Sequence, residues 1–147
     1  MNNNMRLGIA VLALAGFGAL IYSNYKTPEQ MAAPATGDAP AGRAMVQVKV
    51  PELTGQAAIG KRAFDAKCAS CHGENAAGQV GVAPSFINPI YRPGHHGDMA
   101  FLMAARNGVR SHHWRFGDMP PVDGITDAEV KTIVAYVRAL QQANGIN

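Results

Sequence analysis

A continuous apolar run dominates the N-terminal part of the chain. Residues 7–22 (LGIAVLALAGFGALIY) carry no charged side chain, and Arg6 is the only charge that precedes them. Extended through Tyr25, this run would form a helix about 28 Å long, close to the roughly 30 Å hydrocarbon core of a bilayer. We therefore expect residues 1–25 to form an N-terminal membrane anchor, with a cleaved signal peptide as the alternative.

No helical or strand periodicity follows this run. Residues 26–51 contain four prolines and many small residues, a composition typical of a flexible tether. Within them, residues 45–50 (MVQVKV) alternate between apolar and polar side chains. This patch is short, so we interpret it as an extended arm that leads into a domain, with a brief strand as the alternative.

Residues 52–147 show the periodicity of helices, and we expect an all-α domain. The first helix is predicted over about 54–69 and the second over about 98–107, with Gly108 as its C-terminal stop. The third begins at a capping box formed by Thr126 and Glu129. Its apolar stripe follows at helical spacing, as Val130, Ile133, Val134, Val137 and Leu140.

Long loops rich in glycine and proline separate these helices, over residues 73–97 and 109–124. A domain of about 95 residues with such loops has few side chains left to build a core. We expect a group other than side chains to fill its centre.

Composition narrows the possible functions. The chain has 48% hydrophobic and 16% charged residues, which is typical of neither a disordered chain nor a multi-span membrane protein. Its net charge is +3 and its aromatic content is 7%, so we expect no nucleic-acid partner. The 2 cysteines are three positions apart, which excludes a disulfide framework.

The two cysteines belong to the motif Cys68-Ala69-Ser70-Cys71-His72. C-x-x-C-H is the attachment signature of c-type haem, in which two thiols one helical turn apart bind the porphyrin and the histidine faces the iron. A thioredoxin-like site belongs near a βαβ pattern, and a zinc site needs a second ligand cluster. Neither is present in the sequence. We predict one haem c, bound covalently through Cys68 and Cys71.

From about residue 54 to 147, the chain resembles the class I single-haem bacterial cytochromes c. Their small all-α fold has three to four helices and long loops wrapped around the covalently attached haem. The resemblance implies that the carbonyl of Pro84 holds the proximal ligand His72 and that Met119 is the distal iron ligand. The matching positions, in the family's order, are Gly60, Phe64, Cys68, Cys71, His72, Gly73, Gly78, Pro84, residues 117–120 (GDMP) and Tyr136, which crosses the first helix at Gly60.

Met119 is the predicted sixth ligand because a thioether favours ferrous iron and suits electron transfer. Pro120 and Pro121 would keep its loop stiff. Met99 and Met103 are the alternatives, but both lie in the second predicted helix, where methionine more often fills gaps in a core. We predict no catalytic residue.

Two histidine pairs, His95-His96 and His112-His113, have no counterpart in the family's minimal pattern. We expect them to face solvent or to bind the haem propionates, since adjacent side chains rarely point the same way. A second metal, such as copper, is the alternative, and His/His ligation of the haem is another. Trp114 and Arg115 are further candidates for binding a propionate.

The expected function is that of an electron carrier, not an enzyme. The resemblance implies a bacterial inner-membrane protein with its haem domain in the periplasm, and Arg6 before the apolar run agrees with this orientation. Its partners would be a redox protein donor and acceptor, such as membrane respiratory complexes or a periplasmic dehydrogenase. The alternatives are a dedicated haem subunit of a dehydrogenase or oxidase complex, and a haem enzyme or sensor with a displaceable methionine.

Overall fold

The computed structural model describes residues 41–147. This part of the chain contains four α-helices and two 3-10 helices, joined by loops. The α-helices are α3 (Gly55–Lys67), α4 (Ala69–His72), α5 (Asp98–Asn107) and α6 (Asp127–Ala143), with η1 (Glu74–Ala76) and η2 (Pro89–Tyr91) in the loop before α5. These residues contain isolated β-bridges but no strand. The predicted all-α fold is confirmed.

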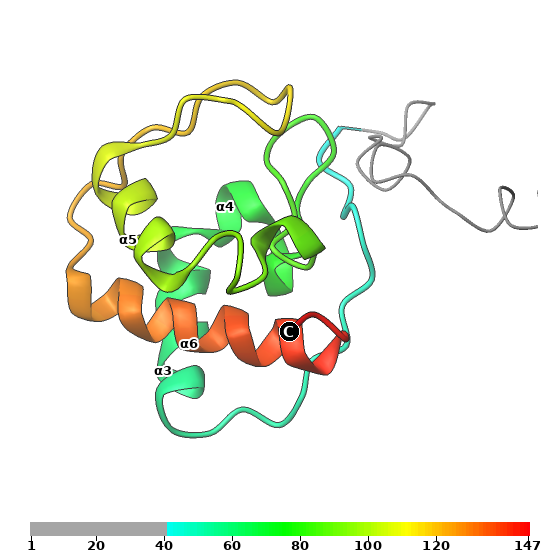
Figure 1. Cartoon of the computed structure of the whole chain (residues 1–147), viewed down its shortest axis with the longest axis vertical. Helices are drawn as coiled ribbons and strands as arrows, with labels where there is room; N and C mark the ends of the chain where they lie inside the picture. Colours follow the sequence, from blue (N-terminus) through cyan, green and yellow to red (C-terminus); the bar gives the residue numbers. More distant parts are fainter. Residues whose placement is uncertain (1–40) are drawn as a thin grey trace, which may run out of the picture. The chain divides into compact units, whose positions relative to one another are not determined.

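Helices α3 and α6 cross at Gly60 (Figure 1). A Cβ atom on Gly60 would lie 1.8 Å from the backbone oxygen of Thr132, so only glycine allows this approach. Beside the crossing, the rings of Phe64 and Tyr136 pack 5.5 Å apart and are fully buried. The crossing that the resemblance implied, glycine on one helix and Tyr136 on the other, is present.

The predicted apolar stripe of α6 forms the main core of the domain. Its residues Val130, Ile133, Val134, Val137 and Leu140 are all buried. The capping box at its start is confirmed as well, because the Thr126 Oγ1 accepts a hydrogen bond from the Glu129 N–H and the Glu129 carboxylate accepts one from the Thr126 N–H.

The first predicted helix differs from the structure. It is broken at Cys68, whose φ of −119° ends α3, and α4 begins at the next residue. The periodicity over 54–69 missed this break because helical spacing continues on both sides of it. Ile59 of α3 is 43% exposed, although its side chain is apolar.

Part of the predicted tether lies against the domain. The Gly42 and Val80 backbones are joined by a hydrogen bond of 2.9 Å, and the Lys49 N–H and C=O both bond the Asn144 side chain, at 2.9 and 2.8 Å. Residues 45–46 form a bend and residues 47–50 have no regular structure, so the patch does not form a strand. The folded unit therefore reaches about ten residues beyond the expected boundary at residue 52, because backbone groups in this arm find partners on the domain.

The predicted anchor, residues 1–25, lies outside the described residues. Within residues 41–147, none of the helices has the length and apolar character needed to cross a bilayer.

Candidate functional site

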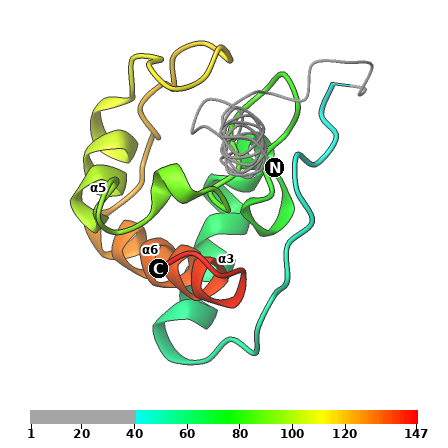
Figure 2. The same ribbon diagram turned by 45° about the vertical axis from the view of Figure 1, so that its right-hand side comes forward.

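A cavity of about 650 Å³ lies where the sequence predicts a missing core. Its walls are mostly apolar and come from α4, the loop at residues 82–86, α5, and the loop between α5 and α6. Figure 2 shows α5 and the yellow loop after it set apart from α3. Cys68, Cys71, His72 and Met119 all line this cavity. Its volume is typical of a site for a small molecule or cofactor.

Cys68 and Cys71 lie at one wall, on a single turn. Cys68 caps α4, and the His72 N–H bonds its carbonyl oxygen at 2.9 Å. The two thiols are not joined by a disulfide. Burial, reinforced by the nearby Cys71, raises the pKa of Cys68 to about 11. A thiol with this pKa is protonated at neutral pH, which argues against a thioredoxin-like nucleophile.

His72 is buried, with 7% of its surface exposed, at the end of α4. Its Nδ1 lies 3.0 Å from the Pro84 carbonyl oxygen, which can only accept a hydrogen bond, so Nδ1 carries the proton. Burial lowers the pKa of His72, an effect that the bond to Pro84 partly offsets. The side chain is therefore a neutral imidazole with its Nε2 lone pair free for a metal.

Buried polar contacts hold the Pro84 carbonyl in place. The Ser85 hydroxyl donates to the Ala76 carbonyl at 3.0 Å and accepts from the Ile87 N–H at 2.9 Å. Gly78 packs against this segment with φ +70°, and a Cβ there would lie 2.3 Å from the Ser85 nitrogen. This contact gives a physical reason for glycine at position 78.

Sequence reasoning missed two residues that brace the site. The Phe86 ring stacks on the His72 ring at 4.2 Å between centroids, and Gln79 Nε2 donates to the Ser70 carbonyl at 2.8 Å, inside the cysteine motif. The only sequence feature that could have indicated a role for Phe86 is its position two residues after Pro84. Nothing in the local pattern singles out Gln79.

Met119 is held in its loop by a pair of backbone hydrogen bonds with Val109, both 2.9 Å. A Cβ on Gly108 would lie 2.4 Å from the Met119 oxygen, so the glycine that ends α5 also allows this pairing. Met103 lines the cavity too, whereas Met99 does not. The expectation that a helix methionine fills a core is wrong for Met99, which is 65% exposed.

The two histidine pairs converge, contrary to expectation. The rings of His96 and His113 lie 5.2 Å apart, and those of His95 and His113 lie 5.6 Å apart. Partial desolvation, then the charges of the three other histidines, lower the pKa of His113, although its side chain is exposed. The Trp114 indole N–H, expected as a propionate donor, instead bonds the Tyr91 hydroxyl at 3.0 Å and joins the two loops.

The residues present fit a c-type haem. An apolar cavity of suitable size has both thiols, a neutral imidazole with an oriented lone pair, and a thioether on its walls. These are the groups that attach and ligate such a haem.

Comparisons with known proteins agree with this fit. Residues 57–141 match the family model described as Cytochrome c. The chain is 34% identical over 91 residues to the Cbb3-type cytochrome c oxidase subunit CcoP of Rhodobacter capsulatus, covering 58% of this chain and 29% of that subunit. The chain thus spans less than a third of this relative's length. No solved structure matches it significantly.

Proposed function

This chain belongs to the cytochrome c family, with one covalently attached c-type haem, and we propose that it carries single electrons between redox proteins. The observation that carries the proposal is the apolar cavity with Cys68, Cys71, His72 and Met119 on its walls. When bound, the haem supplies an iron that alternates between the ferrous and ferric states. The side chains of the protein would hold this group in place and shield it from water.

We assign the proximal side to α4. Cys68 and Cys71 would hold the group covalently, and His72 would provide its Nε2 as an iron ligand. The Pro84 carbonyl, 3.0 Å from Nδ1, fixes the ring's tautomer and raises the basicity of the ligand nitrogen. Stacking of Phe86 on the imidazole, at 4.2 Å, restricts rotation of the ring. A ligand that keeps its position in both oxidation states reduces the structural cost of electron transfer.

On the distal side, we assign Met119 as the sixth ligand. Its backbone is paired with Val109, and two prolines follow it, so the loop has little freedom to move. A neutral, soft thioether favours the ferrous state and raises the reduction potential. With Met119 bound to the iron, no open position would remain for peroxide, which would favour a carrier over a haem enzyme.

The ligand assignment is tested by replacing each of the two methionines that line the cavity. Oxidised wild-type protein should show the weak near-infrared band of sulfur-to-iron charge transfer. Met119→Ala should abolish this band and allow carbon monoxide to bind the reduced protein. Met103→Ala is the matched control, since Met103 lines the same cavity from α5, and the band should persist in it.

A band that survives in Met119→Ala but disappears in Met103→Ala would transfer the ligand role to Met103. A wild-type protein that lacks the band and binds carbon monoxide readily would favour the sensor or enzyme alternative.

A second candidate function is that of a dedicated haem subunit in an oxidase complex. Similarity to the oxidase subunit CcoP favours it, although the chain covers 29% of that protein. The two functions differ in whether the protein stays bound to its partner or associates with it only transiently. A dedicated subunit should copurify with its complex in fixed ratio from solubilised membranes of its own bacterium, whereas a free carrier should separate from it at moderate salt.

We also propose that residues 1–25 anchor the chain in the bacterial inner membrane, with the haem domain in the periplasm. The uncharged run at residues 7–22 and Arg6 before it support this orientation. Mass spectrometry of haem-loaded protein from the membrane fraction provides the test. An intact N-terminal segment is expected, whereas a mature chain that begins after residue 22 would identify a signal peptide.

A further inference from the structure

Four histidines from two separate loops meet beside the haem cavity. His95 and His96 directly precede α5, and His112 and His113 lie in the loop that follows it. One potential ligand atom from each of His95, His96 and His113 lies within 4.8 Å of the other two. His96 and His113 also line the cavity, so this cluster borders the site of the haem.

His96 is already oriented as a metal ligand would be. Its Nδ1 lies 2.7 Å from the Ile90 carbonyl oxygen, so Nδ1 donates a proton there and the Nε2 lone pair stays free. Metal-binding histidines usually use their second ring nitrogen in this way, which fixes the tautomer and the ring orientation.

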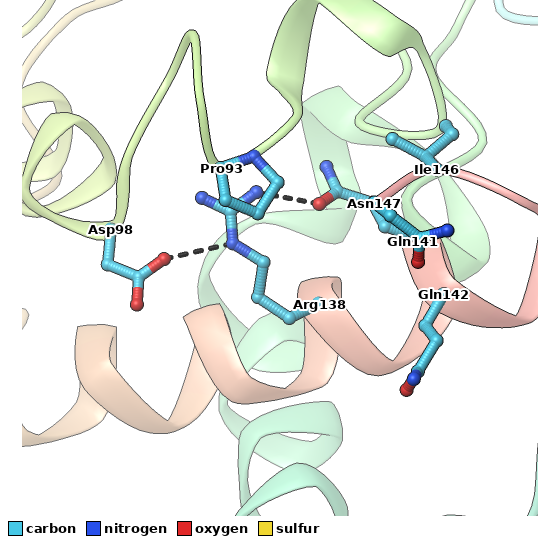
Figure 3. A pocket seen from close by; sticks show the side chains of 7 residues that line it. All are labelled: Pro93, Asp98, Arg138, Gln141, Gln142, Ile146 and Asn147. Carbon is cyan, nitrogen blue, oxygen red and sulfur yellow. Dashed lines mark hydrogen bonds and ion pairs between the residues drawn. The ribbon is translucent and has the colours of Figure 1, made fainter.

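The backbone around His96 is anchored as well. The Arg138 Nη2 donates to the His96 carbonyl oxygen at 2.7 Å. The same guanidinium bonds the Asp98 carboxylate and the Gln141 side chain, at 2.9 and 2.6 Å (Figure 3). It also donates to the Tyr91 carbonyl oxygen at 2.6 Å. With these partners Arg138 is engaged in structural contacts, and it holds the first histidine pair against α6.

His113 is brought to His96 by the bond from Trp114 to Tyr91, which joins the two loops one residue away from it. Within residues 41–147, the ring nitrogens of His95 and His113 make no hydrogen bond, and both side chains are exposed. Both rings can therefore turn a lone pair toward the free nitrogen of His96 without losing a protein contact.

From this geometry we propose that His95, His96 and His113 bind a divalent late-transition-metal ion, Cu²⁺ foremost, at the edge of the haem cavity. Neutral imidazole suits copper, nickel and zinc, and Cu²⁺ binds a given nitrogen site most tightly among the divalent first-row ions. With no carboxylate or other oxygen ligand in the set, hard ions such as Mg²⁺ and Ca²⁺ are disfavoured. Three protein ligands leave a coordination position for water or a small ligand.

The test uses the full haem-loaded chain, stripped of loose metal with a chelator and titrated with Cu²⁺. We expect one tightly bound Cu²⁺ per haem, with nitrogen hyperfine structure in its electron paramagnetic resonance spectrum and weaker binding of Zn²⁺. His113→Gln should lower the affinity by about 100-fold, since even partners outside the ligand set change metal affinity by 10–100-fold. His95→Gln should have a similar effect.

His112→Gln is the matched control. His112 is adjacent to His113 in the same loop, but it lies outside the three-atom group and its Nδ1 bonds the Arg110 carbonyl at 2.8 Å. This variant should keep nearly the full affinity. An equal loss in His112→Gln, or copper binding that survives in the double variant His95→Gln/His113→Gln, would overturn the proposed site.

The haem spectrum separates this result from the proposed electron-carrier function. An unchanged visible spectrum in each variant shows that the domain is folded and loaded, so a loss of copper binding then reports on the histidines alone. A protein with normal haem ligation that binds no copper would refute the metal site and leave the electron-carrier function intact.

Discussion

At the scale of single residues, two positions of this domain require glycine because backbone segments approach each other closely there. Gly60 lets α3 contact the backbone of α6, and Gly108 does the same for the Met119 loop. In both places a Cβ atom would meet a carbonyl oxygen at less than 3 Å. A flexible neighbour could rotate away from such a contact, but a helix or a paired loop can only shift as a unit.

Gly60→Ala tests this argument for the helix crossing. Alanine favours an isolated helix by about 1 kcal/mol over glycine. Here the added Cβ would lie 1.8 Å from the Thr132 oxygen, and overpacking of this kind costs about 3 kcal/mol. Denaturant unfolding of the haem-loaded protein should show a net loss of stability.

Gly94→Ala is the control, because a Cβ at this position meets no described atom within 4 Å. It should change the free energy of unfolding by less than about 0.5 kcal/mol. Equal effects of the two substitutions would show that the crossing is not sterically limited.

At the scale of elements, the two longest helices begin differently. Thr126 caps α6 through a side-chain hydrogen bond, whereas Thr54 at the start of α3 makes no such bond. The pair therefore offers the same residue type at the same helical position with and without its capping contact.

Thr126→Ala should cost about 1 kcal/mol, the usual contribution of a side-chain cap. Thr54→Ala should cost a few tenths of a kcal/mol at most, since no capping bond is lost. Thermal unfolding of the two variants under identical conditions measures the difference. Comparable losses of stability in the two variants would indicate that the capping hydrogen bond of the Thr126 side chain does not stabilise the protein.

The same cap predicts a dependence on pH. Hydrogen bonds from the Thr126 backbone, then from its hydroxyl, lower the pKa of Glu129 below its ordinary 4.5. A depressed carboxyl pKa stabilises the folded state above the unfolded-state pKa, and this contribution is lost as the pH falls through the folded-state value. The difference in stability between wild type and Glu129→Gln should therefore shrink below pH 4.5. A difference that is constant with pH would contradict the assignment.

At the scale of the whole described domain, an N-terminal arm is bound to the C-terminal end of α6. The Asn144 side chain accepts from the Lys49 N–H and donates to the Lys49 carbonyl, across 95 positions of sequence. Partly buried Val48 and Leu53 pack on the core on either side of this contact. The arm thus belongs to the folded unit.

Asn144→Ala should release this arm. The loss of the two hydrogen bonds to Lys49, and of a third to the Leu140 carbonyl, should cost about 1 kcal/mol, and the Lys49 amide should exchange its hydrogen faster with solvent. Gln142→Ala, an exposed position two residues earlier in the last turn of α6, is the control and should leave that amide unchanged. Slow exchange at Lys49 in both variants would show that apolar contacts alone hold the arm.

Local sequence features determined the helices, the capping box and the chemistry of the haem motif. Periodicity located α5 and the apolar stripe of α6, and the C-x-x-C-H spacing identified the cofactor, because both signals lie within a few adjacent turns. The shortage of core residues also predicted a filled centre, and the structure has an apolar cavity there.

Long-range contacts were decided by the tertiary structure alone. The stacking of Phe86 on His72, the binding of the arm to Asn144 and the convergence of the histidine pairs each join residues that are distant in sequence and have no shared pattern. Adjacent histidines were expected to diverge, and they converge because Trp114 and Arg138 fix the two loops from outside the pairs. Side-chain periodicity describes one element at a time, whereas the meeting of two loops depends on how the helices between them pack.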